Sequence, residues 1–142
     1  MISDTARLGW KLLVLMAMSA GLFSALCQAA DSQVLLVGKW GGDGVNIVFG
    51  PDGAHLDYDC AVGSIATPTH VDAQGRFSVM GLYESYQIGP DRVDSSPKRR
   101  AASYDGHIVG AVLELHVRVE GESVTRRFRL DKDRKVKLAR CL

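Results

Sequence analysis

The sequence predicts an all-β protein, a single antiparallel up-and-down barrel of about eight strands, with a β-sandwich as the alternative. Apolar side chains after residue 31 recur with period two, turn-forming residues interrupt them at short intervals, and no stretch shows the 3.6-residue period of an amphipathic helix. Consecutive hairpins in this number favour closure, because a closed barrel leaves no unpaired strand edge. The interior of such a barrel is filled by side chains or holds one small ligand.

The N-terminus predicts a helical signal peptide over residues 1–30. Arg7 and Lys11 form a basic region, an uncharged apolar run follows, and the run ends in the small-residue exit Cys27-Gln28-Ala29-Ala30. We expect cleavage after one of the two alanines, a mature barrel domain at residues 31–142, and a periplasmic or secreted protein.

Two alternatives keep the chain at a membrane. An uncleaved N-terminal anchor needs about 20 apolar residues, and the run from Leu12 to Leu26 is shorter. A lipid-modified Cys27 is the other alternative, although Leu26 and Ser24 stand where the usual lipoprotein signal has a small residue and a leucine.

The mature domain is expected to be electrically neutral. Of the 17 basic and 16 acidic residues, removal of Arg7, Lys11 and Asp4 leaves 15 of each sign. General attraction to nucleic acid or to an anionic membrane requires a strongly one-signed surface. We therefore expect no nucleic-acid partner and no stable membrane insertion after cleavage.

Two cysteines remain after cleavage, Cys60 and Cys141. An even number in an oxidising compartment predicts one disulfide, and two unpaired buried thiols are the alternative. Closing so long a loop should stabilise the fold by ~4.5 kcal/mol.

The first half of the mature chain predicts three strands joined by tight turns. An apolar run that closes on Gly-x-Trp predicts a first strand at residues 34–40, followed by a glycine-rich turn at residues 41–44. Alternating apolar residues predict a second strand at residues 45–49. Gly50-Pro51-Asp52-Gly53 is a strong turn signal, because proline presets one φ and glycine tolerates a positive one. A third strand is expected at residues 54–61.

The middle of the chain is less regular. Pro68 ends a short piece, and Asp72-Ala73-Gln74-Gly75 predicts a turn into a strand at residues 76–83. Residues 84–97 form the longest irregular stretch, and a loop of this length in a compact domain is usually functional or mobile. We expect the next strand to begin at residues 101–104, before a turn at Asp105-Gly106.

Alternation is clearest in the last third. In the strand predicted at residues 108–119, four side chains share one face: Leu113, Leu115, Val117 and Val119. A turn at residues 120–123 leads into a strand at residues 124–130, and a turn at residues 131–134 leads into a final strand at residues 135–142.

Residues near the two ends of the mature chain resemble the calycin arrangement of lipocalins and avidins. These are Gly38 and Trp40 of the Gly-x-Trp on the first strand, and Arg140 near the end of the last. The resemblance implies that the tryptophan plugs the closed end of the barrel and that the arginine stacks on its indole face. Arg140 shares its strand parity with Val136 and Leu138, which points it inward.

The sequence also departs from both families. A lipocalin continues into a C-terminal helix, and avidins line their ligand site with several tryptophans, whereas no tryptophan follows Trp40. No ligand residue can therefore be transferred. Tyr58-Asp59-Cys60-Ala61 and Arg140-Cys141-Leu142, with the opening Gly-x-Trp, also resemble a group of small exported bacterial proteins to which no activity is assigned.

The sequence gives little support for catalysis or metal binding. His55, Asp57 and Asp59 share one face of the predicted third strand, but strand neighbours two apart lie about 6.6 Å apart, and a solvated polar face explains them better. The chain has no Gly-x-Ser-x-Gly and no defined partner for the other histidines, and its glycines at 41–44 do not open a phosphate-binding helix. We expect no enzyme, no metal and no cofactor.

Candidate contact residues gather around the long irregular stretch. Tyr83, Tyr86 and Ile88 border its start and are candidate contacts with a ligand or partner, unless they only attach the loop to the barrel. Arg99 and Arg100 follow its end and could dock an anionic group, or keep the foot of the loop soluble.

Arg126 is a further candidate. It stands in phase with Phe128 and Leu130, so we expect it in the barrel mouth or paired inside the barrel. An unpaired buried arginine would be costly.

We therefore expect an exported binding module that holds an apolar or amphipathic small molecule at its open end. This expectation fails if six side chains fill the interior and leave no cavity: Phe49, Phe77, Met80, Leu113, Leu115 and Phe128. The alternative is an envelope protein-binding module, for example a hydrolase inhibitor, acting through residues 84–100.

Overall fold

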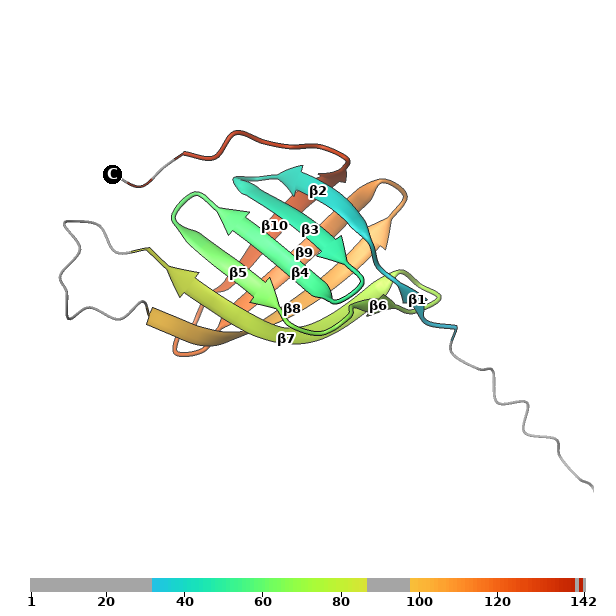
Figure 1. The fold of residues 1–142 in the computed structure, drawn as a ribbon, viewed down its shortest axis with the longest axis horizontal. Helices are drawn as coiled ribbons and strands as arrows, with labels where there is room; N and C mark the ends of the chain where they lie inside the picture. Colours follow the sequence, from blue (N-terminus) through green and yellow to red (C-terminus); the bar gives the residue numbers. More distant parts are fainter. Residues whose placement is uncertain (1–31, 87–97, 140, 142) are drawn as a thin grey trace, which may run out of the picture. The chain divides into compact units, whose positions relative to one another are not determined.

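The structure, a computed structural model, describes residues 32–86, 98–139 and 141 (Figure 1). The predicted signal peptide lies outside these residues. The ten strands are β1 (Val34–Leu35), β2 (Gly38–Gly42), β3 (Val45–Gly50), β4 (Gly53–Tyr58), β5 (Ala61–Ile65), β6 (His70–Val71), β7 (Arg76–Ser85), β8 (Lys98–Val109), β9 (Val112–Val119) and β10 (Thr125–Lys132).

Eight strands form a closed antiparallel barrel, which confirms the predicted fold class. Around the barrel, strands β2, β3, β4, β5, β7, β8, β9 and β10 each pair with the next, while β1 and β6 form a separate two-stranded sheet. β10 closes the barrel on β2, where Asp131 pairs with Gly41 and Lys132 with Trp40. In the part of the chain described here, no helix is long and apolar enough to cross a membrane.

The first predicted strand is interrupted. Residues 34–40 divide into β1 and β2, because Leu36 turns inward and is buried, and its backbone N–H donates to the carbonyl of Thr69 at 2.8 Å. The glycine-rich turn is also tighter than predicted. Gly41 and Gly42 belong to β2, and only Asp43 and Gly44 form the turn, with φ of 47° and 75°, as a two-residue hairpin turn requires.

The predicted third strand is a hairpin. The chain leaves β4 after Tyr58 and re-enters the sheet as β5 at Ala61, so the expectation of one strand over residues 54–61 is wrong. Asp59 sits in the turn, where its carboxylate accepts the backbone N–H of Ala139 at 2.7 Å. Because β4 ends at Tyr58, Asp59 does not continue the face of His55 and Asp57.

The predicted turn at Asp105-Gly106 is also wrong, because β8 runs through both residues and ends at Val109. Gly106 instead leaves room for an aromatic ring: a Cβ built on it would lie 2.2 Å from two ring carbons of Phe77. A glycine inside a strand often marks such a close approach. The chain turns four residues later, at Gly110, with φ of 61°.

The C-terminal segment is not the predicted final strand. After β10, residues 134–139 run along the outside of the barrel beside β2 and β3 (Figure 1), and we call residues 134–139 together with Cys141 the strap. The side-chain amide of Asn46 holds it like a strand partner: Asn46 donates to the carbonyl of Val136 at 2.8 Å and accepts its N–H at 2.9 Å.

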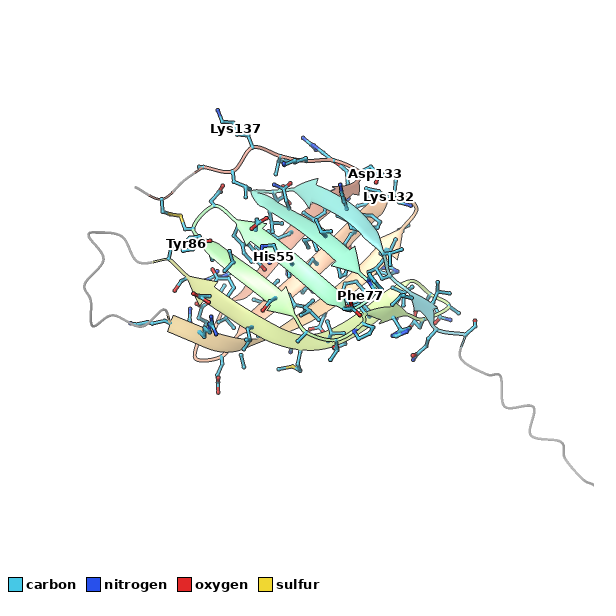
Figure 2. All side chains as sticks on the ribbon, in the orientation of Figure 1. His55, Phe77, Tyr86, Lys132, Asp133 and Lys137 are labelled. Atoms are coloured by element: carbon cyan, nitrogen blue, oxygen red, sulfur yellow. A yellow bond between two sulfur atoms is a disulfide. The ribbon has the colours of Figure 1, made fainter. Side chains whose placement is uncertain are left out.

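The predicted disulfide between Cys60 and Cys141 is present, with the two Cα atoms 5.4 Å apart (Figure 2). It joins the end of the strap to the turn between β4 and β5. The strap is therefore attached at its start by β10 and at its end by a covalent bond.

Candidate functional site

The barrel interior is a continuous packed core. The largest side chains that are almost fully buried are Tyr104, Ile47, Leu56, Leu113, Leu115 and Leu130. Of the six side chains expected to decide whether the interior is filled, Phe49, Phe77, Leu113 and Leu115 are buried in this core and Phe128 packs against it. Met80 points outward and is 65% exposed.

One end of the barrel carries the turns between β2 and β3, β4 and β5, and β9 and β10, as the hairpin order requires. We call this end the mouth. An open hollow of about 400 Å³ lies there. Nine residues line it: Asp43, Gly44, Tyr58, Asp59, Cys60, Tyr83, Arg126, Arg127 and Phe128.

Aromatic rings form the apolar part of the hollow. The ring of Tyr58 lies 5.4 Å from that of Tyr83 and 5.6 Å from that of Phe128, centroid to centroid, in tilted or edge-to-face geometry. Both tyrosines are more than nine-tenths buried. Such pairs stabilise by about 0.5–1.5 kcal/mol beyond their burial, so these rings form a firm base below the mouth.

Two arginines share one carboxylate beside these rings. Glu122 accepts from Arg126 Nη2 at 2.9 and 3.0 Å and from Arg100 Nη2 at 2.7 Å. Arg126 also donates to the hydroxyl of Tyr83, and its guanidinium lies 4.7 Å from the centre of that ring, in cation–π range. We call Tyr83, Arg100, Glu122 and Arg126 the arginine cluster.

The arginine cluster carries an excess positive charge. Two guanidinium groups face one carboxylate, and the three charged side chains are only 22–35% exposed. Partial burial by itself lowers the pKa of Arg126, but the hydrogen bond to Tyr83 and the charge of Glu122 outweigh that effect and raise it. Arg126 therefore remains charged at every physiological pH.

Deeper in the barrel, two tyrosine hydroxyls are buried. Tyr104 donates to the carbonyl of Leu82 at 2.7 Å, while the Tyr58 hydroxyl has no well-aligned hydrogen-bond partner among the described residues. Burial, reinforced by the neighbouring Tyr104, raises the pKa of Tyr58. Burial also raises the pKa of Tyr104 to about 12.

The predicted contact residues separate into two groups. Tyr83, Arg100 and Arg126 come together in the arginine cluster, although they lie far apart in the sequence. Arg99 points away from the cluster, is exposed, and pairs with Glu84 at 2.9 Å. Tyr86 is half exposed and borders the strap, and its backbone N–H donates to the carbonyl of Cys60 at 3.0 Å.

Ile88 falls outside the described residues, as does most of the predicted loop. The loop is also shorter than predicted, because Glu84 and Ser85 pair with Arg99 and Lys98 as parts of β7 and β8.

The predicted plug is described only in part. Trp40 is 3% exposed, and its indole N–H has no hydrogen-bond partner among the described residues. Gly38 lies beside this indole with φ of 133°. Arg140 lies outside the described residues, and residues 135–139 before it belong to the strap and not to a strand of the barrel.

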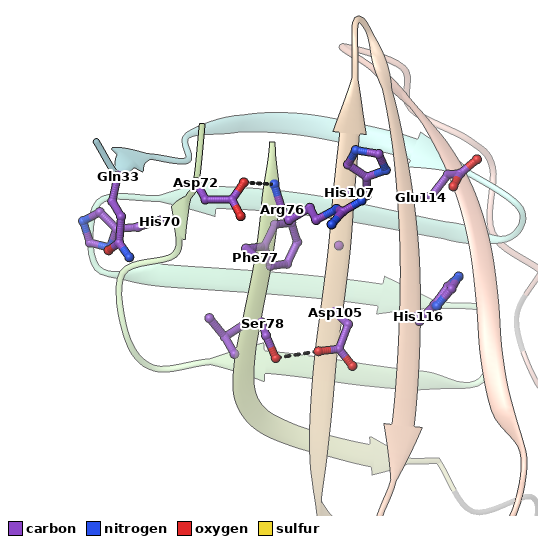
Figure 3. Close-up of a pocket in the computed structure, with 12 residues that line it drawn as sticks. Gln33, His70, Asp72, Arg76, Phe77, Ser78, Asp105, His107, Glu114 and His116 are labelled. Atoms are coloured by element: carbon purple, nitrogen blue, oxygen red, sulfur yellow. Dashed lines mark hydrogen bonds between the residues drawn. The ribbon is translucent and has the colours of Figure 1, made fainter. Parts of the chain in front are cut away.

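A second hollow, of about 740 Å³, lies on the outer face of β7, β8 and β9 (Figure 3). It contains three of the four histidines of the chain, His70, His107 and His116, for which the sequence suggested no partners. The pairing of β8 with β9 places two of these histidines beside acidic residues: His107 lies opposite Glu114, and His116 lies opposite Asp105.

Ser78, Asp105 and His116 form a row across this face, but they do not form a nucleophilic triad. The hydroxyl of Ser78 donates to Asp105 at 2.5 Å (Figure 3), and Asp105 also accepts from Arg118 at 2.9 Å. In a triad the serine donates to the histidine, which the carboxylate holds from the other side. Here the carboxylate stands between the serine and the histidine.

Two of the residues considered as metal ligands, His55 and Asp57, lie on the surface of β4. His55 and Asp57 form an exposed pair at 2.9 Å. No group of three His, Cys, Asp or Glu side chains in the described residues is close enough together to hold a metal ion.

Tyr58 and Phe128, which line the hollow, and Glu122, which pairs with two arginines, were not identified from the sequence as site residues. Tyr58 and Phe128 were assigned to the apolar face of their strands, and Glu122 to a turn. One signal was present for Glu122, because it precedes Arg126 by four residues. A spacing of four residues predicts a side-chain ion pair on a helix, but it does not predict one across a hairpin turn.

Comparison with known proteins assigns no family: no family model, curated protein or solved structure matches this chain.

Proposed function

We infer that the protein is an exported, calycin-like binding module that receives an amphipathic small molecule at its mouth, and not inside its barrel. One observation carries this proposal. Aromatic rings and guanidinium groups converge in an open hollow of about 400 Å³, directly above a filled interior. That volume falls within the range of small-molecule sites, which combine apolar walls with a few placed polar groups.

The chemistry of the mouth supports an amphipathic ligand. Tyr58, Tyr83 and Phe128 offer ring surfaces for an apolar group. Arg126, which lines the hollow, offers a charged guanidinium for a polar group at one side. A wholly apolar ligand would remove water from the exposed part of the Arg126 side chain, at a free-energy cost.

Export and the calycin likeness are parts of the same proposal. The basic and apolar N-terminus supports a signal peptide, and the Cys60–Cys141 disulfide is compatible with an oxidising compartment. The buried Trp40 of the Gly-x-Trp and the closed barrel support the calycin likeness.

Native mass spectrometry of the protein, purified gently from its own cell envelope, tests this function. We expect extra mass that is lost on denaturation, and a polypeptide that begins near Asp31. The variant Tyr83→Leu should lose the extra mass, whereas Met80→Ala, on the outer face, should keep it. A bare polypeptide in all three preparations would count against a small-molecule ligand.

A protein partner is the second candidate, because the paired strands β7 and β8 hold both ends of the segment at residues 84–100 in place. β7 and β8 pair from Arg76 and His107 up to Ser85 and Lys98, and the Glu84–Arg99 ion pair lies near the end of this ladder. Replacing residues 87–97 by a short Gly/Ser linker should then remove a co-purifying envelope protein. Retention of every partner by that variant would exclude this segment as the contact.

A further inference from the structure

We propose that the Cys60–Cys141 disulfide is a redox switch: a dithiol reductant opens it, the strap is released, and binding at the mouth weakens. The last step rests on the proposed function, whereas the first two do not. Three properties of the described residues lead to this inference: where the disulfide lies, what else holds the strap, and which side chains the strap ties down.

The first property is the position of the disulfide outside the core. Cys60 is exposed in the turn between β4 and β5, and Cys141 is half-buried. The barrel closes where β10 pairs with β2, before the strap begins. Exposed disulfides are the labile and regulatory ones, whereas structural disulfides resist reduction. Reduction therefore removes a tie on the surface and leaves the barrel closed.

The second property is the weak attachment of the strap apart from the disulfide. Among the described residues, no side chain of the strap belongs to the buried core. Two hydrogen bonds join Val136 to Asn46, and one joins Ala139 to Asp59. Water can replace each of these bonds at a small net cost. The strap therefore depends on the disulfide to keep its end on the barrel.

The third property is what the strap covers and ties down. A hollow of about 590 Å³ is lined by the strap on one side and by barrel residues, among them Asn46 and Tyr86, on the other. This hollow and the mouth share Tyr58 and Asp59, and Cys60 also lines the mouth. The segment from Tyr58 to Cys60 thus supplies three of the nine residues of the mouth, and the strap holds it in place.

Release of the strap should weaken binding at the mouth through this segment. In the oxidised protein Asp59 accepts the N–H of Ala139 at 2.7 Å, and the disulfide fixes the next residue, Cys60. Both ties are lost when the strap leaves. A freer segment must be ordered again when a ligand binds, and this ordering costs affinity.

The chemistry of the switch is thiol–disulfide exchange. A thiolate of the dithiol attacks the sulfur of Cys60, the exposed partner, and forms a bond to it. The Cys60–Cys141 bond breaks, and Cys141 leaves as a thiolate that takes up a proton. The second thiol of the reductant then attacks its partner sulfur in the mixed disulfide, and Cys60 leaves in the same way. The protein gains two electrons and two protons, and the dithiol becomes a disulfide.

Thiol alkylation followed by peptide mass spectrometry tests the first step on the folded protein, with dithiothreitol as the dithiol. We expect both Cys60 and Cys141 to be alkylated while the circular dichroism spectrum of the barrel stays unchanged. Reduction that occurs only after urea has unfolded the barrel would overturn the inference.

Hydrogen exchange then measures release of the strap. Reduction should speed exchange of the Val136 and Ala139 amides at least ten-fold and exchange in β9 less than two-fold. Cys141→Ser should show the fast exchange without reductant. Asn46→Ala is the matched control, because it loosens the strap but keeps the disulfide, so reduction should still speed exchange of its Ala139 amide. Strap exchange that does not change on reduction would overturn the inference.

The fluorescent aromatic amphiphile 8-anilinonaphthalene-1-sulfonate probes the mouth. We expect the oxidised protein to bind it at least ten-fold more tightly than the reduced protein or Cys141→Ser, and Tyr83→Leu to bind it weakly in both states. Partial unfolding exposes apolar surface and raises binding of this dye, so the expected loss cannot arise from a loss of fold.

Equal affinity for the dye in the oxidised and reduced protein would overturn the last step of the switch, as would an affinity that Tyr83→Leu leaves unchanged. A bare polypeptide in native mass spectrometry would instead count against the proposed function. Hydrogen exchange in the strap decides the first two steps in either case, so the two failures are distinguishable.

Discussion

Gly106 shows what one residue decides in this fold. Its missing side chain is the space that the Phe77 ring occupies, and Phe77 in turn contacts Phe49 at 5.7 Å between centroids in edge-to-face geometry. The Asp-Gly pair looks like a turn locally, but the ring that crosses it comes from another strand. Packing therefore overrides the local turn preference.

Gly106→Ala should destabilise the protein by about 2–3 kcal/mol, because overpacking a filled core costs this much. Equilibrium urea unfolding would measure the loss. Gly110→Ala serves as the control, since a Cβ there meets nothing within 4 Å and only its φ of 61° is strained. Phe77→Leu should relieve part of the penalty of Gly106→Ala, and strictly additive effects would show that the ring is not the obstacle.

The buried tyrosines predict a loss of stability at alkaline pH. The pKa of Tyr104 is about 12 in the folded protein against 10.0 for a free tyrosine, and that of Tyr58 is also raised. Between these values the unfolded chain loses its protons first, so the free energy of unfolding falls as the pH rises above 10. The loss should reach about 1.4 kcal/mol per tyrosine at pH 11.

Urea titrations at pH 8, 10 and 11 would measure this decline. The double variant Tyr58→Phe and Tyr104→Phe should be less stable at pH 8, because the bond to Leu82 is lost. Its free energy of unfolding should nevertheless fall much less above pH 10. Tyr86→Phe, at a half-exposed position, should decline like the unsubstituted protein. An equally steep fall in the double variant's free energy of unfolding would show that these hydroxyls do not cause the decline.

At the scale of elements, the strap is the main departure from the expected strand order. Lys135 to Leu138 alternate polar and apolar residues as an edge strand does. The β10 strand already closes the barrel on β2, so this segment finds no free edge in the sheet. It packs on the outside, where the carbonyl of Arg134 lies so close to Gly41 that a Cβ there would be 2.3 Å away.

Cys141→Ser should lower the free energy of unfolding by about 2–4 kcal/mol and the melting temperature by several degrees. Thermal unfolding followed by circular dichroism would show the shift. A reducing agent should lower the melting temperature of the unsubstituted protein and leave that of the variant unchanged. Equal melting curves with and without the disulfide would mean that the disulfide adds no stability.

Asn46→Ala removes both hydrogen bonds to Val136 and should cost about 1–3 kcal/mol. If the strap acts as one unit, this cost should shrink when Cys141→Ser is also present, because the strap is then already loosened. Urea unfolding of the two single variants and the double variant measures the coupling. Full additivity would show that the two attachments act independently.

At the scale of the whole molecule, the filled interior separates this barrel from one that encloses its ligand. Leu115 is 1% exposed at the centre of the core. Leu115→Ala should destabilise by about 2–5 kcal/mol, because it leaves a cavity that rigid strands cannot close. Met80→Ala, on the outer face, should change stability by less than about 0.5 kcal/mol. A small effect of Leu115→Ala in urea unfolding would indicate an open interior.

Much of the architecture follows from local pattern. The alternation from Leu113 to Val119 correctly predicts which side chains of β9 face the core. Arg126 alternates in step with Phe128 and Leu130, which correctly predicts that these three side chains lie on one face of β10. Both inferences depend only on the period of a strand. They hold because neighbouring side chains in one strand must point to opposite faces.

The site is less visible in the sequence. Tyr83 and Arg126 are separated by 43 positions, and nothing local shows that Arg126 bonds to Tyr83 or shares Glu122 with Arg100. Which strands pair, and in which register, is decided by the sum of many weak contacts across the barrel. The mouth exists only once those pairings bring four segments to one end.

The sequence by itself determined the all-β class, the approximate number of strands, the buried faces of β9 and β10 and the pairing of Cys60 with Cys141, because alternation and composition carry these properties locally. Only the tertiary structure decided that Gly106 lies within a strand, that residues 134–139 and 141 form a strap, and that two arginines share one carboxylate at the mouth. Each of these depends on residues far apart in the chain, where steric fit and charge pairing outweigh local preference.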